Sequence, residues 1–132
     1  MSDGKTWPSL RFDFATGARL GPGKADLMER VAEHGSIRAA GAAMGMSYRR
    51  AWLLADEINR MFREPVIAAK HGGKAGGGAA LTPLGEEVLA RYRAMEAQAR
   101  AIYAEELRWL ADVMNPGFEA KAGKSKAAEP DD

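Results

Sequence analysis

Two arginines at the start of a short helix are the strongest chemical signal in this chain. Arg49 and Arg50 follow Tyr48 and Ser47, and the Ser47 hydroxyl is placed to accept from the free amides of a helix N-terminus. A planar guanidinium fork matches guanine O6 and N7, or a phosphate, with two hydrogen bonds. An arginine pair on a helix is most often a solvated surface, but this position favours double-stranded DNA. We expect Tyr48 to touch a phosphate or a thymine methyl group, and the sequence leaves Trp52 open between core and contact.

Residues 71–78 are a second chemical candidate, because five glycines surround Lys74 there. A nucleotide-binding P-loop needs a hydroxyl residue directly after its lysine, and Ala75 stands in that place. This argues against nucleotide binding and leaves a spacer or the tip of a wing that approaches DNA phosphates. Lys70 and Lys74 favour the wing, since lysines add salt-dependent affinity that ignores base sequence. The wing candidates for DNA contact are Lys70, Gly72, Gly73 and Lys74.

No catalytic or metal centre can be argued from the sequence. His34 and His71 are the two histidines, and neither has a further metal ligand four residues on or an acidic cluster beside it. The chain has no cysteine, which excludes disulfides and thiolate chemistry. No nucleophile motif of the G-x-S-x-G type is present. We therefore predict that the protein is not an enzyme and has no cofactor.

The elements that would position the arginines lie within residues 36–62. Ser36 and Ser47 are expected N-caps of two helices, and Gly45 permits a positive φ at the bend between them. Small side chains would let the two helices cross closely, namely Ala39, Ala40, Gly41 and Ala43. The expected apolar anchors are Met44 and Met46 at the turn, with Ala51, Leu54, Ala55 and Ile58 along a second helix that ends near Phe62. The pattern predicts a helix-turn-helix.

The flanking patterns extend this unit. Residues 10–14 alternate as in a short strand, residues 22–34 have a helical apolar stripe that ends before Gly35, and residues 66–70 and 79–81 could form a hairpin. The predicted fold is mainly α: a winged helix-turn-helix with a short N-terminal strand, a β-hairpin wing and a long C-terminal dimerisation helix. The predicted divisions are a flexible N-terminus at 1–9, the DNA-binding domain at 10–81, the long helix at 82–114 and a disordered tail at 115–132.

The long helix predicts a dimer. Thr82 and Pro83 form a strong helix start, and without a stop signal before residues 115–117 the helix would run roughly 45–50 Å. A small domain cannot cover an apolar stripe of that length, so homodimerisation is the better interpretation. The candidate dimerisation residues are Val88, Tyr92, Met95, Ile102, Tyr103 and Leu110.

Charge and hydropathy agree with a soluble, cytoplasmic protein that meets a polyanion. The 132 residues include 19 Lys or Arg and 18 Asp or Glu, for a net charge of +1. Residues 1–81 hold 12 basic and 8 acidic residues, a balance of +4, whereas residues 82–132 hold 7 and 10, a balance of −3. No apolar run reaches the roughly 18 residues of a membrane span, and we expect no membrane partner.

Three segments carry a family resemblance. They are Gly-Ser-Ile-Arg-Ala-Ala at 35–40, Gly-Met-Ser-Tyr-Arg-Arg-Ala-Trp at 45–52, and the glycine-rich stretch with its following strand at 71–82. Together with the order of elements, they resemble the N-terminal DNA-binding domain of the ModE family over about residues 10–113. These are bacterial molybdate-responsive transcriptional regulators, whose winged helix is similar to that of LysR-type regulators.

The resemblance implies a homodimer, clasped by the first strands and the long helix, on an inverted-repeat operator of molybdenum-related genes. By position, it implies that Ser47, Tyr48, Arg49 and Arg50 enter the major groove, that residues 70–78 form the wing, and that Arg38 supports a phosphate contact. The alternative hypothesis is a stand-alone dimerising module that pairs with a full-length regulator through the long helix and binds no operator itself.

The sequence departs from the family pattern after residues 115–117. Full-length members continue into β-rich oxyanion-binding modules that supply the molybdate site, whereas a short charged tail follows here. We therefore expect no molybdate site in these 132 residues.

Overall fold

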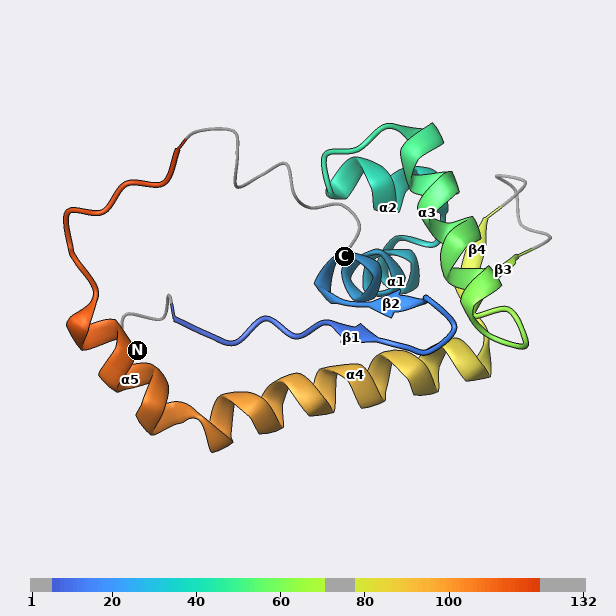
Figure 1. Cartoon of the computed structure of the whole chain (residues 1–132). Helices are drawn as coiled ribbons and strands as arrows, with labels where there is room; N and C mark the ends of the chain where they lie inside the picture. Colours follow the sequence, from blue (N-terminus) through green and yellow to red (C-terminus); the bar gives the residue numbers. More distant parts are fainter. Residues whose placement is uncertain (1–5, 71–77, 122–132) are drawn as a thin grey trace.

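In the computed structural model, residues 6–70 and 78–121 are described, and they form five helices and two small antiparallel hairpins (Figure 1). The elements are β1 (Phe12–Asp13), β2 (Arg19–Leu20), α1 (Pro22–His34), α2 (Ile37–Ala43), α3 (Tyr48–Met61), β3 (Ile67–Ala69), β4 (Ala79–Leu81), α4 (Pro83–Ile102) and α5 (Ala104–Val113). Their order is that of a winged helix-turn-helix, which confirms the predicted fold class. Most of the predicted flexible N-terminus and tail lies outside the described residues.

The helix starts around the turn follow from side-chain capping, as predicted. The Ser36 hydroxyl accepts from the amide of Ala39 at 3.0 Å, and the Ser47 hydroxyl accepts from the amide of Arg50 at 3.1 Å. Gly45, between α2 and α3, has a φ of 74°, a backbone conformation that side chains other than glycine's rarely adopt. These three residues fix where each helix begins and how sharply the chain turns.

Helices α2 and α3 cross closely enough to exclude a side chain from Gly41. A Cβ added to Gly41 would lie 2.6 Å from the Cβ of Ala51, and Ala40 and Ala51 are fully buried. Met44 and Met46 are half-buried and pack against the core from either side of the turn. The crossing therefore depends on small residues, with the methionines filling the space around them.

Helix α1 is the centre of the main core. It packs against α2, α3, α4 and β4, and Figure 1 shows it between α4 and the helix-turn-helix. Leu27, Met28 and Val31 of α1 are completely buried, together with Ile58 of α3 and Val66 before β3. All ten members of this cluster are apolar, so burial of apolar surface holds the three-helix unit together.

A second core joins the N-terminal hairpin to α4. Leu20, Ala25 and Tyr92 are buried there, and the Tyr92 ring meets the Phe12 ring edge-on at a centroid distance of 6.3 Å. The Tyr92 hydroxyl donates to the carbonyl of Leu10 at 2.6 Å. Tyr92 is therefore a core residue of its own chain.

The N-terminal hairpin differs in part from the predicted strand. Residues 10–14 do contain β1, but β1 pairs with β2, a strand that the sequence pattern did not predict. The buried Lys24 explains part of this arrangement. Its ammonium donates to the carbonyl of Arg19 in β2 at 2.9 Å and lies 3.1 Å from the carboxylate of Glu57 in α3. Lys24 thus ties the hairpin and α3 to the start of α1.

Helix α4 is fastened to α1 by Arg93. The guanidinium contacts the carboxylates of Asp26 and Glu29 at 2.8 Å and that of Glu96 at 3.0 Å. Burial alone would lower the pKa of Arg93, but the hydrogen bonds that its guanidinium donates to the three carboxylates outweigh burial and raise the pKa well above its usual value. The cation is therefore permanent, and it fixes the direction of α4.

The prediction of one unbroken helix from residue 83 to 114 is wrong. Helix α4 ends at Ile102, and Tyr103 leaves helical geometry with φ −100° and ψ 15° before α5 begins. Figure 1 shows α5 turning away from the line of α4. Ala99 is buried, whereas none of the α5 residues, all of which the structure describes, is buried. Because none of the α5 side chains is buried in a core that would hold α5 in line with α4, helical periodicity alone could not fix a straight helix.

The close crossing leads to a stability prediction for Gly41→Ala. Alanine is the better helix former by about 1 kcal/mol, but its methyl group would overlap Ala51, and relief of such overpacking costs about 1–3 kcal/mol. We expect a net decrease in the free energy of unfolding, measured by urea denaturation. Gly117→Ala is the control, since the nearest atom to its added Cβ is 3.5 Å away. A stabilised Gly41→Ala protein would contradict the close crossing.

Candidate nucleic-acid interface

The N-terminus of α3 presents its polar side chains to solvent. Tyr48, Arg49 and Arg50 are exposed, and Ser47 is held at the cap by its bond to the Arg50 amide. The first turn of a helix also carries a partial positive charge from its free amides. The arginine side chains and this end of the helix dipole are both positive, so their combined field attracts an anion.

Arg38 joins this surface from α2. Its guanidinium carbon lies 4.3 Å above the centre of the Tyr48 ring, a cation–π contact between two exposed side chains. Stacking uses the face of the guanidinium and leaves its N–H edge as a donor surface. The structure thus brings together Arg38 and Tyr48, which are ten residues apart in the sequence.

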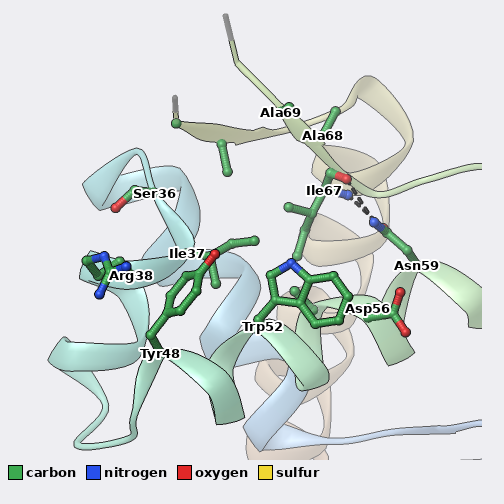
Figure 2. A pocket seen from close by; sticks show the side chains of 13 residues that line it. Ser36, Ile37, Arg38, Tyr48, Trp52, Asp56, Asn59, Ile67, Ala68 and Ala69 are labelled. Atoms are coloured by element: carbon green, nitrogen blue, oxygen red, sulfur yellow. Dashed lines mark hydrogen bonds between the residues drawn. The ribbon is translucent and has the colours of Figure 1, made fainter. Parts of the chain in front are cut away.

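A hollow of about 490 Å³ lies between α3, the start of α2 and the β3–β4 hairpin. Figure 2 shows Tyr48 and Trp52 side by side on one wall, with Asp56 one turn further along α3 and Ala68 and Ala69 of β3 across from them. The Asp56 carboxylate is paired with Arg60 at 3.1 Å, which reduces its repulsion of an anion at this face. The hollow therefore joins α3 and the wing in one concave surface.

Trp52, for which the sequence allows either a core or a surface position, lies at the surface. Its side chain is exposed and lines the hollow, as does Tyr48, whereas Ala51 and Ala55 supply the buried face of α3. Leu53 is also exposed, on the helix face opposite that core. The period of 3.6 residues per turn places Leu53 about 200° around the helix from Ala51 and Ala55, which accounts for its exposure.

Asn59 fastens the wing to α3 and was not recognised from the sequence. Its side-chain oxygen accepts from the amides of Val66 and Ile67 at 2.8 and 2.9 Å. Its amide nitrogen donates to the Ile67 carbonyl at 2.9 Å, and Figure 2 shows Asn59 bonded to Ile67. The sequence signal that could have identified Asn59 is its position as a polar residue next to the apolar stripe of α3. Its partners lie in the following strand, so helix periodicity could not identify them.

The hairpin arms are confirmed as β3 and β4, with Ile67 opposite Leu81 and Ala69 opposite Ala79. The amide of Ala79 donates to the carbonyl of Gly35 at 2.8 Å, which attaches the hairpin to the end of α1. Lys70 is exposed at the end of β3, on the way to the tip. The wing candidates Gly72, Gly73 and Lys74, together with His71, lie outside the described residues.

The dimerisation candidates divide into two groups. Met95, Ile102, Tyr103 and Leu110 are exposed. Val88 is half-buried and packs against both cores of its own chain. Tyr92 is fully buried in the second core. Further exposed apolar side chains extend the first group, namely Trp109 and Val113 in α5 and Met114 directly after it. The four exposed candidates with these three are called the α4–α5 surface below.

The described residues offer no sign of metal or membrane chemistry. Across 6–70 and 78–121, no group of three His, Asp or Glu side chains is arranged to hold a metal ion. In the same ranges, no helix combines the length and the apolar character of a membrane span.

Comparison with known proteins gives no matching family model but several similar sequences. The chain is 46% identical over 82 residues to the molybdenum-pterin-binding protein MopB of Rhodobacter capsulatus, which is 62% of this chain and 30% of that protein. It is 34% identical over 87 residues to the molybdenum transport protein ModE of Azotobacter vinelandii, 66% of this chain and 32% of that protein. It is 34% identical over 71 residues to the DNA-binding transcriptional dual regulator ModE of Escherichia coli K12, 54% of this chain and 27% of that protein. The matches span less than a third of the length of these relatives.

The bonds of Asn59 lead to a second stability prediction. Asn59→Ala leaves the amides of Val66 and Ile67 without their acceptor, and unsatisfied partly buried donors cost about 1–3 kcal/mol. We expect the free energy of unfolding to fall by about that amount in urea denaturation. Arg60→Ala is the neighbouring control, because an exposed pair with Asp56 contributes under about 1 kcal/mol. Equal losses in the two variants would count against the role given to Asn59.

Proposed function

Starting from the homology of this chain to the N-terminal DNA-binding region of ModE regulators, we propose that it is a DNA-binding regulator of transcription. In this proposal it acts as a homodimer on an inverted-repeat operator. The observation that supports it most directly is the start of α3, where Tyr48, Arg49 and Arg50 are exposed beside Arg38. A capped helix end with free arginines fits the major groove, where base edges can be read.

Each element of the candidate interface has a separate part in this mechanism. Arg49 lies on the outward face of α3 and would read a base edge, while Arg50, on the flank of the helix, would contact the phosphate backbone. Arg38 would hold a phosphate with its N–H edge. The wing, which begins at Lys70, would contact the neighbouring backbone, and lysine there adds affinity without base preference.

The proposed target genes are those of molybdenum metabolism. The support is the names of the relatives, a molybdenum-pterin-binding protein and two ModE proteins. Since the matched region is less than a third of each relative, regulation by molybdate is not carried over to these residues.

Homodimerisation is proposed through the α4–α5 surface. Its exposed aromatic and aliphatic side chains form a longer apolar face than a small monomeric domain normally leaves in water. The same face favours one alternative function, a module that pairs with a longer regulator through α4 and α5. The two differ in a simple respect, because the homodimer forms in the purified protein and the module needs a second chain.

Arg49→Ala tests the reading of a base by α3. With a site obtained by in vitro selection from random DNA, we expect the variant to bind about 1–3 kcal/mol more weakly, because one bidentate contact is lost. Fluorescence anisotropy over a salt series gives the affinity and its salt slope. Arg91→Ala removes the same charge from the exposed side of α4 and should bind normally. Sequence-indifferent binding by the wild-type protein would reject the specific regulator.

Ile102→Asp tests the dimer. A carboxylate at this exposed position would be buried unpaired in the proposed contact, so we expect analytical ultracentrifugation to show a dimer for the wild type and mostly monomer for the variant. Leu53→Asp adds the same charge at an exposed leucine on α3 and should remain dimeric. A wild-type protein that is monomeric at all concentrations would favour the pairing module.

A further inference from the structure

Helix α3 leaves three large apolar side chains in water on its outer side. Tyr48 is 44% exposed, Trp52 is 46% exposed and Leu53 is 47% exposed. Two of them have polar tips that can bond to water or phosphate, the Tyr48 hydroxyl and the Trp52 indole N–H. Leu53 has none, so a molecule that covered it would gain the free energy of burying its apolar surface.

The position of Leu53 identifies what would cover it. Residues four apart share a helix face, so Leu53 lies one turn beyond Arg49 and on the same outward side of α3. Trp52 lies next to it and lines the hollow toward the wing (Figure 2). A helix that places Arg49 against base edges therefore carries Leu53 into the same groove.

The cations around this patch favour DNA over a protein as the covering molecule. Arg49 precedes Leu53 by one turn, and Arg50 and Arg38 lie at the same end of α3. Lys70 is exposed directly after Ala69, which lines the hollow. A protein partner for an apolar patch would meet these cations as a desolvation cost, whereas a polyanion is attracted by them. The proposed contact with a protein partner is the α4–α5 surface, which lies on other helices than this patch.

The chemical groups in the major groove then indicate which part of a base pair Leu53 would contact. Each base pair presents donors and acceptors there, and the apolar feature among them is the C5 methyl group of thymine. Leucine against a donor or acceptor would leave that polar group without a partner, while leucine against the methyl group excludes water from both. We infer that Leu53 is a specificity-determining residue that selects thymine by its methyl group, on the basis of the function proposed above.

The experiment removes the methyl group from the DNA and leaves the protein unchanged. The operator is obtained by in vitro selection with the full chain, and each thymine in turn is replaced by deoxyuridine, which pairs identically but lacks the methyl. We expect at least one thymine per half-site whose replacement weakens binding about fourfold, the effect of losing one buried methyl-sized group. Binding is measured by fluorescence anisotropy at one fixed salt concentration.

Variants then connect that methyl group to Leu53. Leu53→Ala should bind the thymine and deoxyuridine operators equally, and Leu53→Met, which keeps an apolar side chain of similar volume, should restore the preference. Phe118→Ala is the control, because it removes an exposed apolar side chain outside both α3 and the α4–α5 surface, and it should keep the wild-type ratio. Because Leu53 is exposed, its replacement is not expected to disturb folding.

The outcomes separate this inference from the proposed function. If an operator is selected but every deoxyuridine substitution leaves its affinity unchanged, or if Leu53→Ala keeps the preference, the inference is overturned and the proposed function stands. If no sequence is enriched and binding is indifferent to sequence, the proposed function fails and the inference with it.

Discussion

The contact between Gly41 and Ala51 decides where the large side chains of α3 can go. Two helices that cross this closely can carry only small residues at the contact, and α3 meets this limit with Ala51 and Ala55 on its buried face. Leu54 and Ile58 pack against the core, and the other large side chains of the first turns of α3 must therefore lie on its flanks and outer face. Tyr48, the arginines, Trp52 and Leu53 are exposed for this reason, which follows from packing before any DNA is considered.

The same helix is fixed at its far end by polar contacts that packing alone would not supply. Lys24 holds Glu57 from the side of α1, and Asn59 holds the start of β3. Apolar packing tolerates small sliding of one helix on another, whereas these bonds have one geometry. The proposed interface is therefore preorganised, so less ordering would oppose DNA binding. The base of the wing is held in the same way, by the bonds of Asn59 to Val66 and Ile67.

The sequence predicted the features that are determined by residues close together in the chain. The caps at Ser36, Ser47 and Thr82 and the positive φ of Gly45 are local, and all four agree with the structure. The parts that it missed depend on residues distant in the chain: the pairing of β1 with β2, the burial of Lys24 and the bonds of Asn59. The bend at Tyr103 belongs to the same group, because neither proline nor glycine marks it and only the loss of packing after Ala99 distinguishes α5 from α4.

This bend has a consequence for how a dimer would space its two reading helices. Half-sites on DNA recur at about one helical turn, roughly 34–36 Å, so the distance between the two α3 helices must be reproducible. Within one chain, Arg93 fixes α4 to α1, and the core fixes α1 to α3, so α4 and α3 move as one unit. Helix α5 lies outside that unit, with none of its residues, all described, in the core. A partner that docked on α5 alone would leave the spacing loose, whereas one that also covers Met95 and Ile102 on α4 would set it.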